Sequence, residues 1–137
     1  MTTRSHGFAA MPKAAPQILL WDLTRLADAT VSNQAIFRKV QPAKSKGKVS
    51  VNLANVPPGN YQLTLRQVGF EKNDAYSAYL EMNAPSQLSR AQEKTLRDDA
   101  RGHAEFEREV KIGADGKFSE TLPLRENDVL LLMLTRQ

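Results

Sequence analysis

Short runs in which apolar and polar residues alternate are the feature that most constrains how this chain can fold. In residues 49–53 and again in residues 61–65, every second residue is apolar. That spacing is typical of a strand with one buried face and one solvated face. Between the two runs, residues 57–60 read Pro-Pro-Gly-Asn, which favours a turn. The sequence therefore predicts two antiparallel strands joined as a hairpin.

Further runs rich in apolar, β-branched or aromatic residues predict more strands. They cover residues 18–21, 35–40, 106–112, 117–122 and 129–134. A Gly-Ala-Asp-Gly turn at residues 113–116 predicts a second hairpin, between residues 106–112 and 117–122. The run at residues 129–134 is apolar throughout, which is typical of a strand that is buried on both faces.

Two short helices are expected in the middle of the chain, near residues 74–82 and 89–101. Asp74 suits the N-cap of the first helix, because its carboxylate can accept hydrogen bonds from the first helical turn. Ser89 and Gln92 have the spacing of a capping box at the start of the second helix. In that motif a hydroxyl and an amide satisfy two backbone N–H groups that would otherwise lack a partner.

Strands of this number and spacing predict a mainly β fold: an antiparallel β-sandwich of about seven or more strands with two helices. The 137 residues fit one domain, which we place at residues 17–137. Residues 1–16 show no structural pattern and are expected to form a flexible N-terminal extension. A complete (β/α)8 barrel needs about 250 residues, so this chain cannot contain one.

Composition and charge argue against several classes of function. The chain has no cysteine, which excludes disulfides, thiolate catalysis and cysteine zinc sites. Its two histidines argue against a histidine-rich metal site. The net charge of +4 arises in residues 1–48, where eight Lys and Arg face two Asp. This segment lacks the motif spacing of nucleic-acid-binding proteins, so a solvated basic loop is the favoured interpretation.

Targeting signals give little information about the compartment. The longest apolar run, residues 129–134, is far shorter than the ~20 residues of a membrane-spanning helix. No apolar stretch of the kind found in signal peptides follows Arg4. We therefore expect no membrane span and no standard export signal, and the localisation stays open.

A search for catalytic constellations identifies no active site. Two carboxylate clusters are available, Asp98-Asp99 and the alternating Glu105, Glu107 and Glu109. Both lack an apolar surrounding that would raise one carboxyl pKa above the other, as acid–base hydrolysis requires. No phosphate-binding loop and no nucleophile elbow are present. The sequence predicts no catalytic residue, no metal ligand and no cofactor.

Aromatic residues are the other candidates for a binding site, because rings can stack on sugars. Trp21 is the only tryptophan, and its apolar neighbours favour core packing over sugar stacking. Tyr76 and Tyr79 lie one helical turn apart and are expected to be core residues with solvated hydroxyls.

Several motifs occur in an order that is informative as a set. Residues 73–85 read NDAYSAYLEMNAP, and residues 88–92 read LSRAQ. They are preceded by LLWD at residues 19–22 and VPPGNY at residues 56–61, and followed by LPLRENDV at residues 122–129. This series resembles the C-terminal region of glycoside hydrolase family 39, which includes β-xylosidases and is related to α-L-iduronidases. Asn83 departs from the glycine usual in the family, but both residues tolerate a left-handed backbone after a helix.

The resemblance implies a β-sandwich that packs beside a catalytic barrel. The catalytic glutamates of the family lie on that barrel, the acid/base in an Asn-Glu-Pro motif, and this chain contains no such motif. No catalytic residue can be transferred to it. The positions that carry the family signature are expected to be structural: Trp21, Asn73, Asp74, Tyr76, Tyr79, Met82, Pro85 and Gln92.

The function implied by the resemblance is that of a non-catalytic accessory domain, xylosidase-like in family, with a glycosidase barrel as its partner. A free-standing carbohydrate-binding module and a protein-interaction module stay open as alternatives. Binding to nucleic acid is disfavoured.

Overall fold

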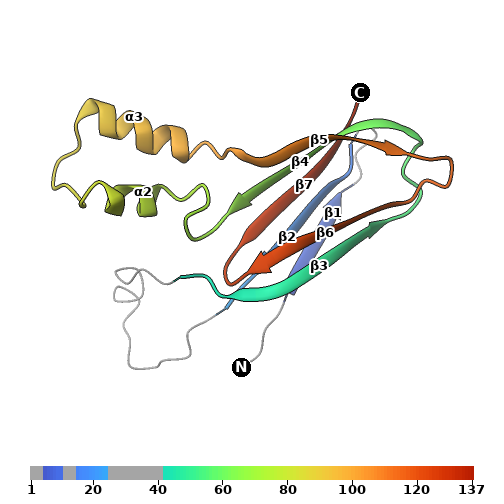
Figure 1. Ribbon diagram of the computed structural model, residues 1–137, viewed down its shortest axis with the longest axis horizontal. Helices are drawn as coiled ribbons and strands as arrows, with labels where there is room; N and C mark the ends of the chain where they lie inside the picture. The colour runs from blue at the N-terminus through green and yellow to red at the C-terminus, as the bar shows by residue number, and fades with distance from the viewer. Residues whose placement is uncertain (1–4, 11–14, 25–41) are drawn as a thin grey trace.

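The computed structural model describes residues 5–10, 15–24 and 42–137 of the chain (Figure 1). These residues form seven strands and two helices. The strands are β1 (Ser5–Ala10), β2 (Gln17–Asp22), β3 (Ser45–Leu53), β4 (Gly59–Val68), β5 (Ala104–Ile112), β6 (Phe118–Arg125) and β7 (Val129–Arg136). The helices are α2 (Ala75–Glu81) and α3 (Arg90–Asp99). The strand expected at residues 35–40 lies outside the described residues.

The strands make two antiparallel sheets that pack face to face. One sheet has five strands in the order β1-β2-β7-β4-β5, and the other pairs β3 with β6. The described chain is therefore a mainly β, antiparallel sandwich with two helices, which confirms the fold class predicted from the sequence. No helix in the described part of the chain is long and apolar enough to cross a membrane.

The core lies between the inner faces of the two sheets. Its apolar side chains come from both sheets and from the loop before β4: Ile18, Val51, Val56, Tyr61, Leu63, Leu65, Ile112, Leu122, Leu124, Leu130, Leu132 and Leu134. In β6 and β7 the buried residues alternate with more exposed ones, as the period of two requires. Burial of these apolar surfaces is the main term that stabilises the fold.

Both predicted hairpins are wrong. β3 pairs with β6, whereas β4 pairs with β5 and β7, so the Pro-Pro-Gly-Asn turn carries the chain from one sheet to the other. The turn at residues 113–116 likewise connects β5 in the larger sheet to β6 in the smaller one. Turn residues mark where the chain reverses but do not specify which strand becomes the partner.

The two inter-sheet turns support each other at one end of the sandwich. Val56 is buried, and its N–H donates a hydrogen bond of 3.0 Å to the carbonyl oxygen of Gly116. Gly116 has a φ of 62°, and a Cβ there would lie 2.9 Å from the carbonyl oxygen of Val56. Glycine is therefore required at this position both by the left-handed backbone and by the close approach of the neighbouring turn.

Arg108, which interrupts the apolar pattern of its strand, closes one edge of the sandwich. It pairs with Leu63 in the sheet register and so faces inward from the edge strand β5. Its guanidinium forms an ion pair with Glu120 of the opposite sheet and lies 5.5 Å from the centre of the Phe106 ring. A charged residue at this inward position is satisfied because its partner also faces the space between the sheets.

The N-terminal segment differs from the expected extension. Ser5–Ala10 form β1, which pairs with β2 along its whole length, from Ser5 opposite Asp22 to Ala10 opposite Gln17. The run was missed because it contains few β-branched residues, and the pairing is supplied by the exposed edge of β2.

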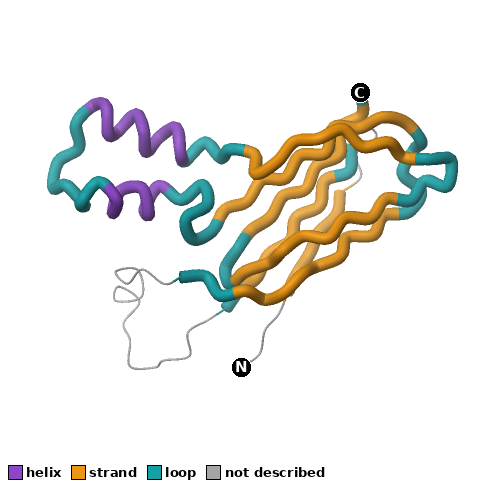
Figure 2. Tube along the Cα trace, in the orientation of Figure 1, coloured by secondary structure: helices purple, strands orange, loops and turns teal. Residues whose placement is uncertain are grey.

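The helices form an arm that projects beyond the ends of β4 and β5, and the two helices lie side by side (Figure 1). Figure 2 shows the same separation, with all helical residues on one side of the strands. The observed bounds agree with the helices predicted near residues 74–82 and 89–101. Neither helix contains a buried residue, so the arm is not part of the sandwich core.

Candidate functional site

The root of the arm, where the chain leaves β4 and returns to β5, depends on one side-chain amide. The Nδ2 atom of Asn73 donates to the carbonyl oxygens of Gln67 at 2.7 Å and His103 at 2.9 Å. Its Oδ1 atom accepts a hydrogen bond of 2.6 Å from the N–H of His103. Asn73 therefore ties the two ends of the arm together, and it does so with a φ of 48°, which asparagine tolerates better than most residues.

Asp74 caps α2, as the sequence predicts. Its Oδ1 accepts a hydrogen bond of 3.0 Å from the N–H of Tyr76, and its Oδ2 accepts one of 2.6 Å from the Ser77 hydroxyl. Both carboxylate oxygens are thus used to hold the first turn of the helix. This arrangement leaves Asp74 poorly suited to catalysis.

The turn after α2 contains two further signature residues, Met82 and Pro85. Met82 is the C-cap of α2, and its N–H donates to the carbonyl oxygen of Ala78 at 3.2 Å. Asn83 has a φ of 64°, so the left-handed backbone inferred at the family's glycine position is present. The Tyr79 hydroxyl donates to the carbonyl oxygen of Pro85 at 3.1 Å and closes the turn.

The second helix begins with the predicted capping box. The Ser89 hydroxyl accepts from the N–H of Gln92 at 3.3 Å, and the Gln92 side-chain oxygen accepts from the N–H of Ser89 at 2.9 Å. Tyr76 departs from expectation, because 45% of the residue is exposed and its ring lies 6.3 Å from that of Tyr79, on the surface of the arm. The expectation that Tyr76 lies in the core is therefore wrong.

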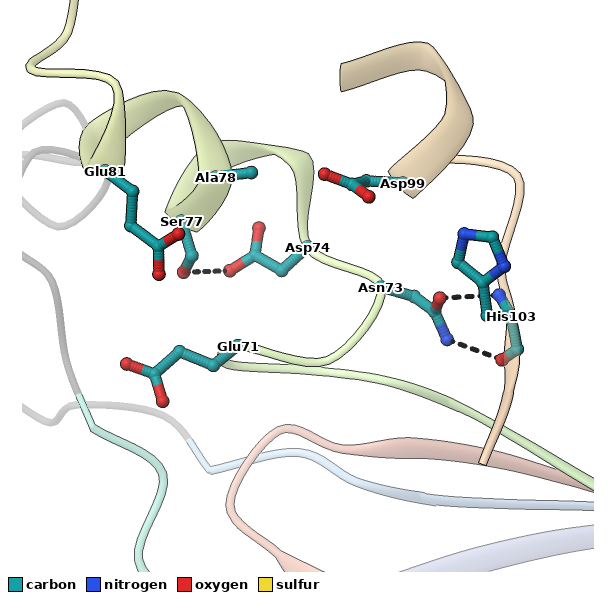
Figure 3. Close-up of a pocket in the computed structure, with 8 residues that line it drawn as sticks. All are labelled: Glu71, Asn73, Asp74, Ser77, Ala78, Glu81, Asp99 and His103. Atoms are coloured by element: carbon teal, nitrogen blue, oxygen red, sulfur yellow. Dashed lines mark hydrogen bonds between the residues drawn. The ribbon is translucent and has the colours of Figure 1, made fainter. Parts of the chain in front are cut away.

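A hollow lies at the root of the arm (Figure 3). Glu71, Asn73, Asp74, Ser77, Ala78, Glu81, Asp99 and His103 line it. In Figure 3 the Asp99 carboxylate extends toward α2 and the Glu81 carboxylate toward Ser77, and no hydrogen bond is drawn between the carboxylates of Glu71, Glu81 and Asp99. The hollow is therefore acidic and open to water.

The chemistry available in the hollow is limited. Three of its polar side chains, those of Asn73, Asp74 and Ser77, are committed to hydrogen bonds at the root and the cap. Glu71 and Glu81 are exposed, so the hollow lacks the apolar surrounding that separates an acid from a base in a glycosidase. Among the described residues, no group of three or more His, Asp and Glu is arranged to hold a metal ion.

A second polar cluster, which the sequence analysis missed, lies under the arm at the turn between β6 and β7. Asp128 is fully buried and accepts hydrogen bonds from the Arg125 guanidinium at 2.9 Å and from Gln67 Nε2 at 2.7 Å. This pairing raises the pKa of the Arg125 guanidinium above its ordinary value. Arg125 also donates to the carbonyl oxygen of Phe70 at 3.0 Å, which connects the sandwich to the root of the arm.

The carboxylate clusters considered from the sequence are surface groups in the structure. Glu105, Glu107 and Glu109 are exposed on β5, and Glu105 is paired with Lys72 at 2.7 Å. Asp98 on α3 is paired with Lys94 at 2.8 Å.

Two solved enzymes match nearly all of this chain. The GH39 enzyme from Xanthomonas axonopodis pv. citri is 36% identical, with a TM-score of 0.87 over 96% of this chain and 26% of its own. A monomeric β-xylosidase from Caulobacter crescentus CB15 is 34% identical, with a TM-score of 0.81 over 95% of this chain and 26% of its own. The chain is therefore similar in sequence and fold to one domain of glycoside hydrolase family 39 enzymes.

The chain spans about a quarter of the length of the solved enzymes that it matches. A bacterial orthologue of human α-L-iduronidase shares the fold, with a TM-score of 0.71 at 14% identity. No model of a known protein family matches the sequence, and no curated protein does either.

The eight signature positions expected to be structural are unevenly distributed in the structure. All of them except Trp21 lie in the arm or at its root. Trp21 is partly buried on β2, opposite Val129 of β7. A role for these residues beyond their local contacts remains a prediction.

Proposed function

We propose that this chain is a non-catalytic accessory domain that packs on the catalytic barrel of a family 39-like glycosidase, with β-xylosidase relatives as the nearest model for its partner. The observation that carries this proposal is the share of each chain that the match covers. Two relatives at 34–36% identity match almost the whole chain, yet the match occupies only 26% of each enzyme. The remaining three quarters of those enzymes are long enough to hold a barrel, whereas this chain is not.

The disposition of carboxylates supports a non-catalytic role. Near the arm, Asp74 is a capping group, Glu105 and Asp98 form surface ion pairs, and the buried Asp128 is held by Arg125 and Gln67. Glycoside hydrolysis needs two carboxyl groups that flank one bond in different environments. The arm and the sheet do not provide such a pair.

The proposal can be tested with a fusion. The Caulobacter β-xylosidase without its matching quarter would be joined to this chain, and the fusion compared with the truncated enzyme and with this chain alone. We expect the chain to unfold at a higher temperature in the fusion than alone, because packing on a barrel stabilises only the folded state. Hydrolysis of an aryl β-xyloside should recover in the fusion and be absent from the chain alone.

An unrelated β-sandwich of similar size, fused at the same point, is the control for a general linker effect. A fused chain that unfolds independently at its own temperature, with no recovery of hydrolysis, would contradict the proposal. Hydrolysis by the isolated chain would contradict the non-catalytic role instead.

One observation favours carbohydrate binding as the second candidate. Tyr76 is 45% exposed and lies beside the Tyr79 ring, so the arm presents an aromatic surface of the kind on which sugars stack. Titration with xylo-oligosaccharides, followed by backbone amide shifts, would test this candidate. Shifts confined to α2 that vanish in Tyr76→Ala would support it, and an unchanged spectrum at millimolar sugar would remove it.

A further inference from the structure

The strand β7 lies in the middle of the five-stranded sheet and is apolar on both of its faces. Its inner residues, Leu130, Leu132 and Leu134, are fully buried in the core. Its outer residues, Val129, Leu131 and Met133, point away from the second sheet, and Val129 remains 39% exposed. A strand that is apolar on both faces is typical of a sheet covered on both sides.

The neighbouring strands continue this apolar surface. The register places Val129 directly between Trp21 of β2 and Val68 of β4. In the next row, Leu19 of β2 lies opposite Leu131, while the β4 neighbour of Leu131 is the exposed Arg66, which bounds the apolar surface on that side. We call this surface the outer patch, and its residues are Leu19, Trp21, Val68, Val129, Leu131 and Met133.

The outer patch is substantially open to solvent. Val68 is 52% exposed and Leu19 is 36% exposed, although both belong to strands that contribute buried residues on their other face. Six large hydrophobic residues of the described chain are exposed, and three of them belong to the outer patch: Leu19, Val68 and Val129. Contiguous apolar surface on a sheet marks an interaction site more often than scattered exposed residues do.

No described element covers the patch. The smaller sheet, β3 and β6, packs on the inner face of the larger one. The arm projects past the ends of β4 and β5 instead of lying over the sheet, and its helices pack against each other (Figure 1). The rim of the patch is polar, because Thr64 lies opposite Glu107 and Gln62 lies opposite Glu109 at the β5 edge.

We infer that the outer patch is the surface by which this domain docks on the catalytic part of a family 39-like enzyme. This inference rests on the proposed function and adds the face that makes the contact. An apolar centre with a charged rim is the usual composition of a stable interface. The occupant is a catalytic domain and not a second copy of this chain, because the Caulobacter relative is monomeric and has no second copy to offer.

The test uses paired substitutions in the fusion to the Caulobacter catalytic part and in the isolated chain. Val68→Lys with Val129→Glu places two opposite charges on directly paired residues of the patch. Such a cross-strand pair is compatible with an exposed sheet surface but not with an apolar interface. The matched control is Ser50→Lys with Thr121→Glu, which are directly paired and exposed on the other sheet.

We expect both pairs to leave the unfolding temperature of the isolated chain within a few degrees of the unmodified chain, because all four positions are exposed. In the fusion, the patch pair should return the unfolding of this domain to the temperature of the isolated chain. The control pair should leave the fusion unchanged. If the charged pair unfolds the isolated chain, Val68→Thr with Val129→Thr gives a milder variant for the same comparison.

The outcomes separate the two proposals. A fusion that packs normally and is insensitive to the patch pair would overturn the docking face while leaving the proposed function intact. Sensitivity to Tyr76→Glu, with no response to the patch pair, would assign the contact to the arm. An unmodified fusion that shows no packing would overturn both proposals. A dimer of the isolated chain that the patch pair converts to monomer would identify a second copy as the occupant and overturn the inference.

Discussion

The sandwich and the arm of this domain are held together by different interactions. The sandwich encloses twelve buried apolar residues between two sheets. The arm has no buried residue in either helix and depends on caps, on the Asn73 amide and on contact between α2 and α3. Short isolated helices are marginal in water, so we expect the arm to open locally without unfolding the sandwich. The predictions below test that difference.

The largest effect is expected from a truncation in the core. Leu132→Ala removes a side chain that is fully buried in the central strand β7. The loss of transfer free energy and the cavity left behind should lower the free energy of unfolding by about 3–5 kcal/mol. Urea denaturation followed by circular dichroism measures this change.

Leu88→Ala is the matched substitution in the arm. Leu88 lies in the segment that connects α2 to α3, and it is 42% exposed. We expect it to change the free energy of global unfolding by less than about 0.5 kcal/mol. Similar losses for the two variants would show that arm and sandwich unfold as one unit, and would contradict the comparison.

The next effect concerns the junction between the two regions. Gly69 follows β4 and precedes the arm, and a Cβ there would lie 2.1 Å from Oδ1 of the buried Asp128. Because Asp128 is fixed by Arg125 and Gln67, it cannot move aside freely. Gly69→Ala should therefore lower the free energy of unfolding by about 1–3 kcal/mol through overpacking.

Gly113→Ala is the control for the loss of glycine itself. A Cβ at Gly113 would lie 3.4 Å from its nearest neighbour, the Oδ1 atom of Asp115. We expect the free energy of unfolding of this variant to remain within about 0.5 kcal/mol of the unmodified value. Equal destabilisation at both glycines would show that backbone flexibility, and not the contact with Asp128, is the reason for glycine at position 69.

The difference between the arm and the sandwich also explains which features of the fold could be predicted from the sequence. The helices and their caps were predictable because a capping box and an N-cap are local signals, and Ser89, Gln92 and Asp74 act within their own turns. The strand runs were also predictable from their period of two. Strand partners were not, because pairing of β3 with β6 joins residues far apart in sequence and depends on packing between sheets.

The candidate site shows a similar limit. The sequence singled out the arm residues through a family resemblance, but it did not indicate the cluster of Asp128, Arg125 and Gln67. Those residues are charged or polar, and nothing in their spacing shows that the β6–β7 turn and a residue of β4 together bury one carboxylate. The outer patch had a sequence signal in the apolar run at residues 129–134, which predicted burial on both faces of the strand, whereas the structure leaves the outer face partly open.

A smaller effect is expected from the cap of α3. Ser89→Ala removes the hydroxyl that accepts the hydrogen bond from the N–H of Gln92, which should destabilise the helix by about 1 kcal/mol. Amide hydrogen exchange at residues 91–94 should become about fivefold faster, while global unfolding in urea is unchanged. Ser86→Ala, in the turn before the helix, is the control and should leave exchange unchanged. A loss in global stability equal to the local loss would show that α3 is coupled to the sandwich.

The smallest effect concerns charge on the surface of α3. The hydrogen bond from the Lys94 ammonium, together with its charge, lowers the pKa of the Asp98 carboxyl below its ordinary value. A carboxyl whose pKa is lower in the folded state stabilises that state above its unfolded pKa of about 4, and this contribution is lost as the pH falls through the folded value. Lys94→Gln should raise the pKa of Asp98 in an NMR titration.

Lys117→Gln is the control, because Lys117 lies in the turn between β5 and β6, at the opposite end of β5 from the arm. It should leave the titration of Asp98 unchanged. Both members of the Lys94–Asp98 pair are exposed, so solvent and salt screen the interaction and its effect on stability should be near the limit of detection. If Lys94→Gln instead unfolded α3, surface ion pairs would be as important as the caps for the stability of the arm. The arm would then lose its structure at acidic pH and at high salt while the sandwich remained folded.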